Sequence, residues 1–142
     1  MYLSRTLTER ALKIWTIGYG SRSRERVLSM LKASGIELVV DIRRWPKSKQ
    51  GDFARENMER WLKEAGISYV WMGDRLGGYR RGGFERYMDT KSFKDGIKEL
   101  LKLASQKRTC LLCLEENPRG CHRRFIARYL QKLGVEVAHI LR

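Results

Sequence analysis

Five short apolar runs alternate with helical patterns along the chain, and this alternation constrains the fold more than any other feature. The runs are rich in β-branched and aromatic residues and cover residues 14–19, 36–42, 67–72, 109–114 and 135–140. Apolar side chains recur at helical spacing in residues 27–31, 53–65, 93–103 and 125–133. Each connection is long enough for a crossover. We therefore predict a three-layer α/β sandwich with a mostly parallel five-stranded sheet, Rossmann-like or rhodanese-like.

The ends of the chain add little to this fold. Residues 1–13 are polar and charged, and we predict an N-terminal extension there, followed by a single α/β domain over residues 14–142. This start has no apolar h-region of a secretory signal, so a cytoplasmic location is expected. No apolar run approaches the roughly 20 residues that a membrane span needs, and no membrane partner is expected.

The charge balance points to a polyanionic partner. Lysine and arginine number 30 against 16 acidic residues, which gives a net charge of +14. Two Asn and three Gln also fit a thermophile-like composition. Thermophile enrichment adds Glu together with Lys, however, whereas the excess here is one-sided. The charge therefore predicts nucleic acid or a phosphorylated small molecule as the partner.

The candidate site follows from the predicted sheet. The carboxyl ends of parallel strands line one edge, where ligands bind in α/β proteins. The most informative stretch is Thr109–Arg124, which reads as a strand, a polar turn and the start of a helix. Free N–H groups at such a helix start favour an anion. Several side chains follow the strand ends and are expected to converge there: Tyr19, Asp41, Arg43, Trp45, Glu115, Cys121, His122 and Arg123.

The two strand-end carboxylates leave alternatives open. Asp41 and Arg43 lie two apart on a strand, hence on one face, and form either a structural ion pair or part of a functional site. Glu115 ends a buried strand, where an isolated charge is costly. We therefore expect a cationic partner for Glu115, such as Arg43 or Arg123.

Cys121 and His122 are candidates for acid–base or nucleophilic roles. At a helix start beside two arginines, a neutral His122 suits a base or a hydrogen-bond donor, or else caps and packs. The same setting favours a Cys121 thiolate, unless Cys121 is simply a small buried residue.

The segment Gly73–Thr90 reads as a long irregular loop with two Gly-Gly pairs and several arginines. A loop of this length is typical of a functional flap. Trp45 and Tyr79 lie in basic, turn-rich contexts that suit base stacking, worth ~1–3 kcal/mol per base. The predicted substrate-binding residues in the flap are Gly77, Gly78, Tyr79, Arg80 and Arg81.

The three cysteines do not resemble a secreted disulfide framework. Cys110 and Cys113 lie three apart on a strand and face opposite sides, so they cannot chelate one ion, and no metal or cofactor is predicted. Whether Cys113 and Cys121 are free or bridged stays open. The spacing from Cys113 to Arg119 matches cysteine phosphatases, but two intervening glutamates would repel a dianion.

The motifs, taken together, resemble the domain-of-unknown-function 488 family. They are Thr16-Ile17-Gly18, Val40-Asp41-Ile42-Arg43 with Pro46, Leu76-Gly77-Gly78, Cys113 with Glu115, Cys121-His122-Arg123, and Gly134 through His139-Ile140. The family's usual His after the first motif is Tyr19 here. The resemblance implies a shared polar constellation of Asp41, Arg43, Glu115, Cys121, His122 and Arg123. The Asp-x-Arg strand end and the Cys-loop-helix are also similar to rhodanese-like domains, at the level of fold alone.

Three functions remain open at this point. The first is an enzyme that hydrolyses a glycosidic or phosphoester bond in nucleic acid or a nucleotide. In it, Asp41 or Glu115 activates water, Arg43 and Arg123 hold negative charge, and His122 exchanges a proton. The second is a nucleic-acid-binding module without chemistry. The third is a rhodanese- or phosphatase-like thiol enzyme with Cys121 or Cys113 as nucleophile.

Overall fold

The computed structural model describes residues 12–142 and confirms the predicted parallel sheet. Its strands are β1 (Lys13–Gly18), β2 (Leu38–Asp41), β3 (Ser68–Trp71), β4 (Thr109–Cys113) and β5 (Glu136–Ile140), all parallel, in the order β3-β2-β4-β1-β5. The predicted N-terminal extension lies outside the described residues over positions 1–11, and Lys13 already belongs to β1. No helix in residues 12–142 has the length and apolarity to cross a membrane.

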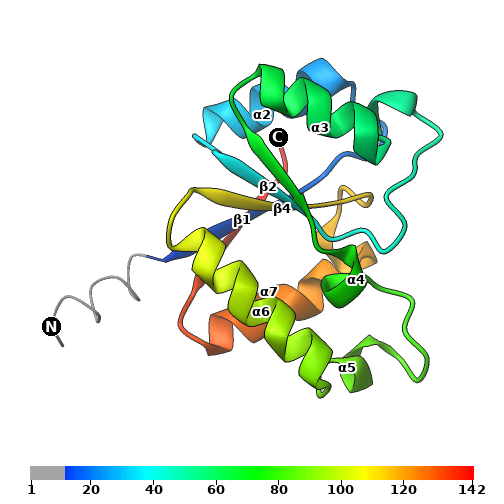
Figure 1. Cartoon of the computed structure of the whole chain (residues 1–142), viewed down its shortest axis with the longest axis vertical. Helices are drawn as coiled ribbons and strands as arrows, with labels where there is room; N and C mark the ends of the chain where they lie inside the picture. Colours follow the sequence, from blue (N-terminus) through cyan, green and yellow to red (C-terminus); the bar gives the residue numbers. More distant parts are fainter. Residues whose placement is uncertain (1–11) are drawn as a thin grey trace, which may run out of the picture.

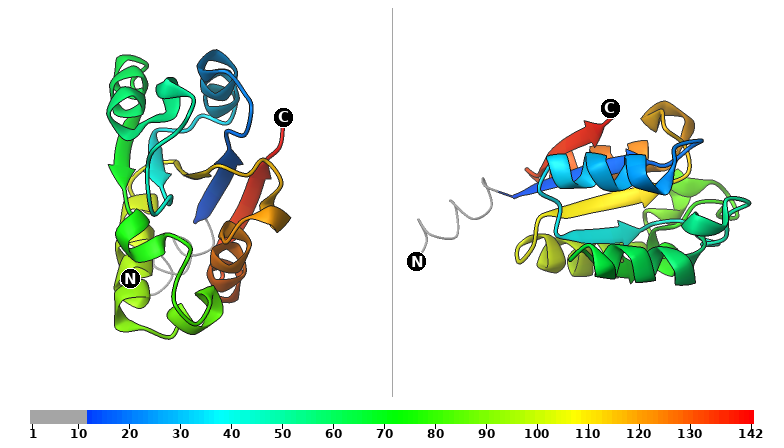
Figure 2. Two further views of the ribbon diagram at one scale, coloured as in Figure 1. Left: turned by 90° about the vertical axis from the view of Figure 1, so that its right-hand side faces the viewer. Right: turned by 90° about the horizontal axis from the view of Figure 1, so that it is seen from above.

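Helices cover both faces of the sheet, which confirms the three-layer sandwich (Figures 1 and 2). One face carries α2 (Arg24–Ala33) and α3 (Arg55–Glu64), with the 3₁₀ turn η1 (Gly51–Phe53) beside them. The other face carries α4 (Gly73–Leu76), α5 (Phe84–Tyr87), α6 (Lys91–Ala104) and α7 (Arg123–Lys132). A second 3₁₀ turn, η2 (Pro118–Gly120), precedes α7.

The central strand β4 divides the core into two clusters. Cys110 and Leu112 pack with the side chains of α2 and α3, whereas Leu111 and Cys113 pack with those of α6 and α7. All five residues of β4 are buried, as expected of a parallel strand covered on both faces. The prediction that Cys110 and Cys113 face opposite sides is therefore confirmed.

The sequence prediction for Gly73–Thr90 was incomplete, because this segment contains the short helices α4 and α5. Each has only four residues, too few to show a helical period or to be stable alone. They are held by Leu76 and Phe84, which are buried in the cluster under α6 and α7. Packing against the core therefore orders much of the predicted flap.

The register of the strands brings their carboxyl ends to one edge. Gly18 at the end of β1 pairs with Cys113 at the end of β4, and Asp41 at the end of β2 pairs with Leu112. The segments that follow β1 and β4 lie against each other. A Cβ added at Gly18 would lie 1.7 Å from the carbonyl oxygen of Glu115, which shows how closely the two backbones approach. The loops that follow β1, β2 and β4 thus share one small space.

Candidate functional site

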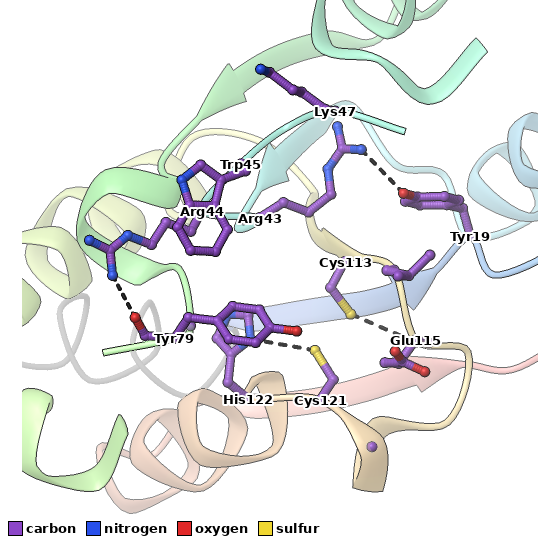
Figure 3. A pocket seen from close by; sticks show the side chains of 13 residues that line it. Tyr19, Arg43, Arg44, Trp45, Lys47, Tyr79, Cys113, Glu115, Cys121 and His122 are labelled. Atoms are coloured by element: carbon purple, nitrogen blue, oxygen red, sulfur yellow. Dashed lines mark hydrogen bonds between the residues drawn. The ribbon is translucent and has the colours of Figure 1, made fainter. Parts of the chain in front are cut away.

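A cavity of about 350 Å³ opens at this carboxyl edge (Figure 3). It lies between the loops that follow β1, β2 and β4, the segment between α4 and α5, and the approach to α7. Its lining combines cations, aromatic rings, thiols, one carboxylate and one imidazole. The lining residues are Tyr19, Arg43, Arg44, Trp45, Lys47, Gly78, Tyr79, Cys113, Leu114, Glu115, Gly120, Cys121 and His122.

Asp41 lies beneath this cavity and does not line it. Its carboxylate is fully buried and accepts four hydrogen bonds, so no lone pair is left for a water or a ligand. The backbone N–H and Nε of Arg43 donate to Oδ1 at 3.0 and 2.9 Å, and Nη2 of Arg43 donates to Oδ2 at 2.6 Å. The Tyr69 hydroxyl donates to Oδ2 at 2.5 Å. The structure shows the predicted ion pair between Asp41 and Arg43, and Arg43 also lines the cavity.

The remaining donors of Arg43 hold the β1 and β2 ends together. Its Nη1 donates to the Phe53 carbonyl at 2.7 Å and to the Tyr19 hydroxyl at 3.4 Å. Burial opposes its charge, but the hydrogen bonds and charge of Asp41 raise the pKa of Arg43 above the ordinary arginine value. Tyr19 is itself buried, and its ring stacks on Phe53 at 4.3 Å. Arg43 therefore shapes the cavity wall with almost all of its hydrogen-bonding capacity in use.

The mouth of the cavity is aromatic and cationic. Trp45 and Tyr79 are 59% and 83% exposed, and their ring centroids lie 5.5 Å apart. The Arg44 guanidinium lies 5.3 Å from the Trp45 ring and donates to the Tyr79 carbonyl at 2.6 Å. Tyr79 has φ 58°, the one non-glycine residue with positive φ in residues 12–142. Such a backbone costs roughly 1–3 kcal/mol and is held in place by its surroundings, here in part by Arg44.

The floor of the cavity contains two free thiols and an imidazole. Cys113 ends β4, and Cys121 lies between η2 and α7. Nδ1 of His122 lies 3.6 Å from the Cys121 sulfur, and the Arg123 backbone N–H donates to that sulfur at 3.5 Å. Gly78 leaves room for the imidazole, because a Cβ at that position would lie 3.1 Å from Nδ1.

The two floor thiols have opposite pKa shifts. The pKa of Cys121 is lowered, first by its interaction with the neighbouring Cys113 thiol and then by His122 and the Arg123 N–H, against the effect of burial. The pKa of Cys113 is raised, first by its interaction with Cys121 and then by burial. Cys121 is thus the more acidic thiol of the pair, at the N-terminus of a ten-residue helix whose dipole favours an anion.

Arg123 lies outside the cavity, fully buried in the core. Its Nη2 donates to the Glu116 carbonyl at 2.7 Å, while Nε and Nη1 are buried without a hydrogen-bond partner. No carboxylate in residues 12–142 forms an ion pair with it. Its charge reaches Cys110, Cys113 and His139, because it acts to lower the pKa of all three.

The expectation of a cationic partner for Glu115 was wrong. Glu115 is exposed, lines the cavity and forms no ion pair within residues 12–142. The next residue, Glu116, is the paired one, 3.5 Å from Nη2 of Arg22 and accepting from the Ser21 N–H at 3.1 Å. The chain leaves β4 at Cys113, so Glu115 does not end a buried strand.

Eight of the predicted site residues meet at the cavity. They are Tyr19, Arg43, Trp45, Gly78, Tyr79, Glu115, Cys121 and His122. Five others do not line it: Asp41, Gly77, Arg80, Arg81 and Arg123. Arg80 donates instead to the carbonyl groups of Gly73, Asp74 and Gly77, and Gly77 packs against the Arg44 backbone.

Sequence reasoning missed Arg44 and Lys47 as members of the site, and named Cys113 only as an alternative nucleophile. The signal for the first two was their place directly after β2, in the same segment as Trp45. For Cys113 it was the last position of the central strand. No group of three or more His, Cys, Asp or Glu in residues 12–142 is arranged to hold a metal ion.

The fold and the site define a three-layer α/β protein with a cationic, thiol-containing cavity at the carboxyl edge of a parallel sheet. The chain belongs to the family described as domain of unknown function DUF488, whose model matches residues 23–130. No curated protein and no solved structure matches the chain.

Proposed function

We propose that the protein is an enzyme that acts on a nucleotide or on nucleic acid bound in the cavity. The observation that carries this proposal is the exposed Trp45–Tyr79 pair beside Arg44 and Lys47, at the mouth of a cavity with ionisable groups on its floor. An aromatic face stacks on a base, and an adjacent cation binds phosphate. The net charge of +14 supports the same class of ligand.

The chemistry we favour is hydrolysis of a glycosidic or phosphoester bond. Of the two candidate carboxylates, Asp41 at the end of β2 has all its lone pairs in use, so the role of base falls to Glu115 in the loop after β4. Glu115 is exposed at the cavity without an ion-pair partner in the described part of the chain. Arg44 and Lys47 line the cavity and have donors to spare for phosphate, whereas Arg43 has nearly all its donors in use and Arg123 is buried outside the cavity.

A thiol-based mechanism is the second candidate, favoured by one specific observation. The Cys121 sulfur is flanked by His122 and by the N–H of Arg123, in the arrangement that activates nucleophilic cysteines. In this alternative the mouth binds the same ligand, and Cys121 rather than a Glu115-activated water attacks it.

Binding is tested first with labelled single-stranded DNA and RNA and with free nucleotides, by fluorescence anisotropy over a series of salt concentrations. We expect affinity to fall steeply with salt. Trp45→Leu is expected to weaken binding about tenfold, since stacking is worth ~1–3 kcal/mol per base. Leu133→Ala is the control, because Leu133 is 54% exposed at the far end of α7. Absence of salt-dependent binding, or equal effects of both variants, would overturn the proposal.

Turnover is tested on a panel of nucleotides and oligonucleotides, including strands with damaged bases, with products separated by chromatography. Glu115→Gln is expected to keep binding and abolish turnover. If turnover instead survives this change and is lost on alkylation of Cys121, the second candidate holds. Binding without turnover of any panel member would identify a non-catalytic module.

A further inference from the structure

The two floor thiols form a pair that neither hydrolysis nor nucleotide binding requires. Cys113 and Cys121 come from the end of β4 and the start of α7, eight positions apart in sequence. Their sulfur atoms point toward one another at the cavity floor (Figure 3), and both are free thiols. Cys110, the third cysteine, lies on the opposite face of β4 and has no access to them.

The environments of the two thiols differ in the way that an attacking and a resolving cysteine require. Cys121 is partly exposed and receives the Arg123 N–H, with His122 beside it. Cys113 is 2% exposed, and its S–H donates to the Glu115 carbonyl at 3.7 Å. A ligand therefore meets Cys121 first, and Cys113 lies buried behind it.

The buried cation of Arg123 is an independent observation that supports an anionic sulfur. A buried charge is costly unless an opposite charge lies nearby. Arg123 is fully buried without a carboxylate partner in residues 12–142, and its Nε and Nη1 are unbonded. The charge of Arg123 reaches the floor of the cavity, where it acts to lower the pKa of Cys113, beside the Cys121 sulfur that accepts from the Arg123 backbone N–H.

We propose that Cys121 and Cys113 form a redox-active dithiol that reduces an anionic disulfide of low molecular mass entering the cavity. The cavity of about 350 Å³ admits a small molecule but no folded protein, and Arg44 and Lys47 at its mouth favour a negatively charged one. This activity uses the cavity of the proposed function but does not depend on a nucleotide.

The reaction proceeds in two exchanges. The Cys121 thiolate attacks one sulfur of the substrate disulfide, the S–S bond breaks, and one thiolate leaves with the electron pair. Cys113 then loses its proton to solvent or to the leaving thiolate and attacks the Cys121 sulfur, which releases the second thiolate. The substrate disulfide is reduced to two thiols, and the protein gains a Cys113–Cys121 disulfide.

Charged groups on every neighbouring element influence the first step. The groups that face the thiols are Glu115 in the loop after β4, His122 and Arg123 at α7, Arg43, Arg44 and Lys47 after β2, Tyr19 after β1, and Tyr79 between α4 and α5. Cations outnumber the one carboxylate in this set, so the surroundings as a whole favour the thiolate.

The test uses the fully reduced protein and two probes, dithiobis(nitrobenzoate) and oxidised glutathione. At pH 6 the wild type is expected to release two equivalents of thionitrobenzoate rapidly and to end as an intramolecular disulfide, seen by peptide mapping. Cys113→Ser and Cys113→Ala are expected to release one equivalent and to stop at a mixed disulfide. Cys121→Ser is expected to react about a hundredfold more slowly, since few ordinary thiols are ionised at this pH.

Cys110→Ser is the matched control and is expected to behave as the wild type, because Cys110 is buried on the other face of β4. A wild type that stops at the mixed disulfide, or a Cys121→Ser protein that keeps the fast phase, would overturn the dithiol. Trp45→Leu separates this proposal from the previous one. It should weaken oligonucleotide binding while the two-equivalent stoichiometry persists, so either proposal can fail without the other.

Discussion

The carboxyl ends of β2 and β4 are neighbours in the sheet, and each leads to a buried arginine, but the two arginines differ in their partners. Arg43 follows β2 and shares a buried ion pair with Asp41, in which nearly every donor and acceptor is matched. Arg123, at the start of α7 after β4, is equally buried, yet two of its three guanidinium nitrogens are unbonded.

The difference in bonding between the two arginines indicates which region gives the cavity its shape and which region supplies its reactive groups. A fully matched polar cluster is rigid and has no bonding capacity left for a ligand. An unmatched buried cation keeps a local positive field that stabilises a neighbouring anion. We infer that the β2 end, together with Tyr19 and Tyr69, supports the cavity wall, while the junction of β4 and α7 supplies its reactive groups.

The largest expected effect comes from breaking the matched cluster. Asp41→Ala leaves Arg43 buried without its carboxylate, and removal of one partner of a buried pair costs about 3–5 kcal/mol. Urea denaturation should show this loss in the free energy of unfolding. Asp52→Ala is the control, because its carboxylate lies on the surface, 3.8 Å from Arg24. A loss below about 1 kcal/mol would mean that Arg43 is hydrated and that the cluster is not rigid.

A smaller effect is expected from Tyr69→Phe, which removes one of the four donors to Asp41 and keeps the ring. A hydrogen bond to a charged group contributes about 1.5–3 kcal/mol. Burial, and after it the charge of Asp41, raises the pKa of Tyr69, so the hydroxyl stays a donor through neutral pH. The change should lower the urea midpoint without altering thiol reactivity at the cavity floor. An altered Cys121 reactivity would show that the two regions are coupled.

Whether a feature of these two regions can be predicted from the sequence depends on how far apart along the chain its interacting residues lie. Strands and long helices follow from local periodicity, and the left-handed glycines Gly35 and Gly66, with φ of 68° and 80°, come just after α2 and α3. The cavity follows in outline because parallel strands share one edge. The short helices α4 and α5 do not follow, because they are ordered by the core rather than by their own residues.

The burial of Arg123 shows a missed signal of another kind. Arg123 shares one face of α7 with Ile126, Ala127 and Leu130, at spacings of three, four and seven residues. That periodicity predicts a buried position for Arg123, but its positive charge led to the prediction that it contacts a ligand. Which glutamate finds a partner could not be predicted, because the choice of Glu116 over Glu115 depends on where Arg22 and Ser21 lie in space.

The pH dependence of the free energy of unfolding tests the second of the two regions, the junction of β4 and α7 that contains Cys121. The pKa of Cys121 is lower in the folded protein than in the unfolded chain, so the unfolded state binds one more proton below the ordinary thiol range. The thiolate therefore stabilises the fold fully above about pH 8.5, and this contribution is lost as the pH falls. Cys113, whose pKa is raised, is protonated in both states in this window.

From pH 7.5 to 6.5, the stability difference between the wild type and Cys121→Ser should shrink by up to about 1.4 kcal/mol. Denaturation at both pH values measures it, and subtraction of the variant removes the contributions of other titrating groups. Cys110→Ser should show no such change, because burial raises the pKa of Cys110 and keeps it protonated. A pH-independent difference would contradict the thiolate.

The smallest effect on stability, and the sharpest test of the comparison, is expected for Arg123→Met. Replacing a buried charge that lacks a partner with an apolar side chain of similar length is often neutral or stabilising, so the free energy of unfolding should change by less than about 1 kcal/mol. The hydrogen bond to the Glu116 carbonyl is lost, which sets a modest cost against the gain. Alkylation of Cys121 at pH 6 should nevertheless slow several-fold, because the positive charge that reaches the cavity floor at Cys113 is gone while the Arg123 backbone N–H to Cys121 remains. A large loss of stability with unchanged alkylation would reverse the argument: Arg123 would then be a structural residue like Arg43, and the anion at the cavity floor would depend on His122 and the helix start alone.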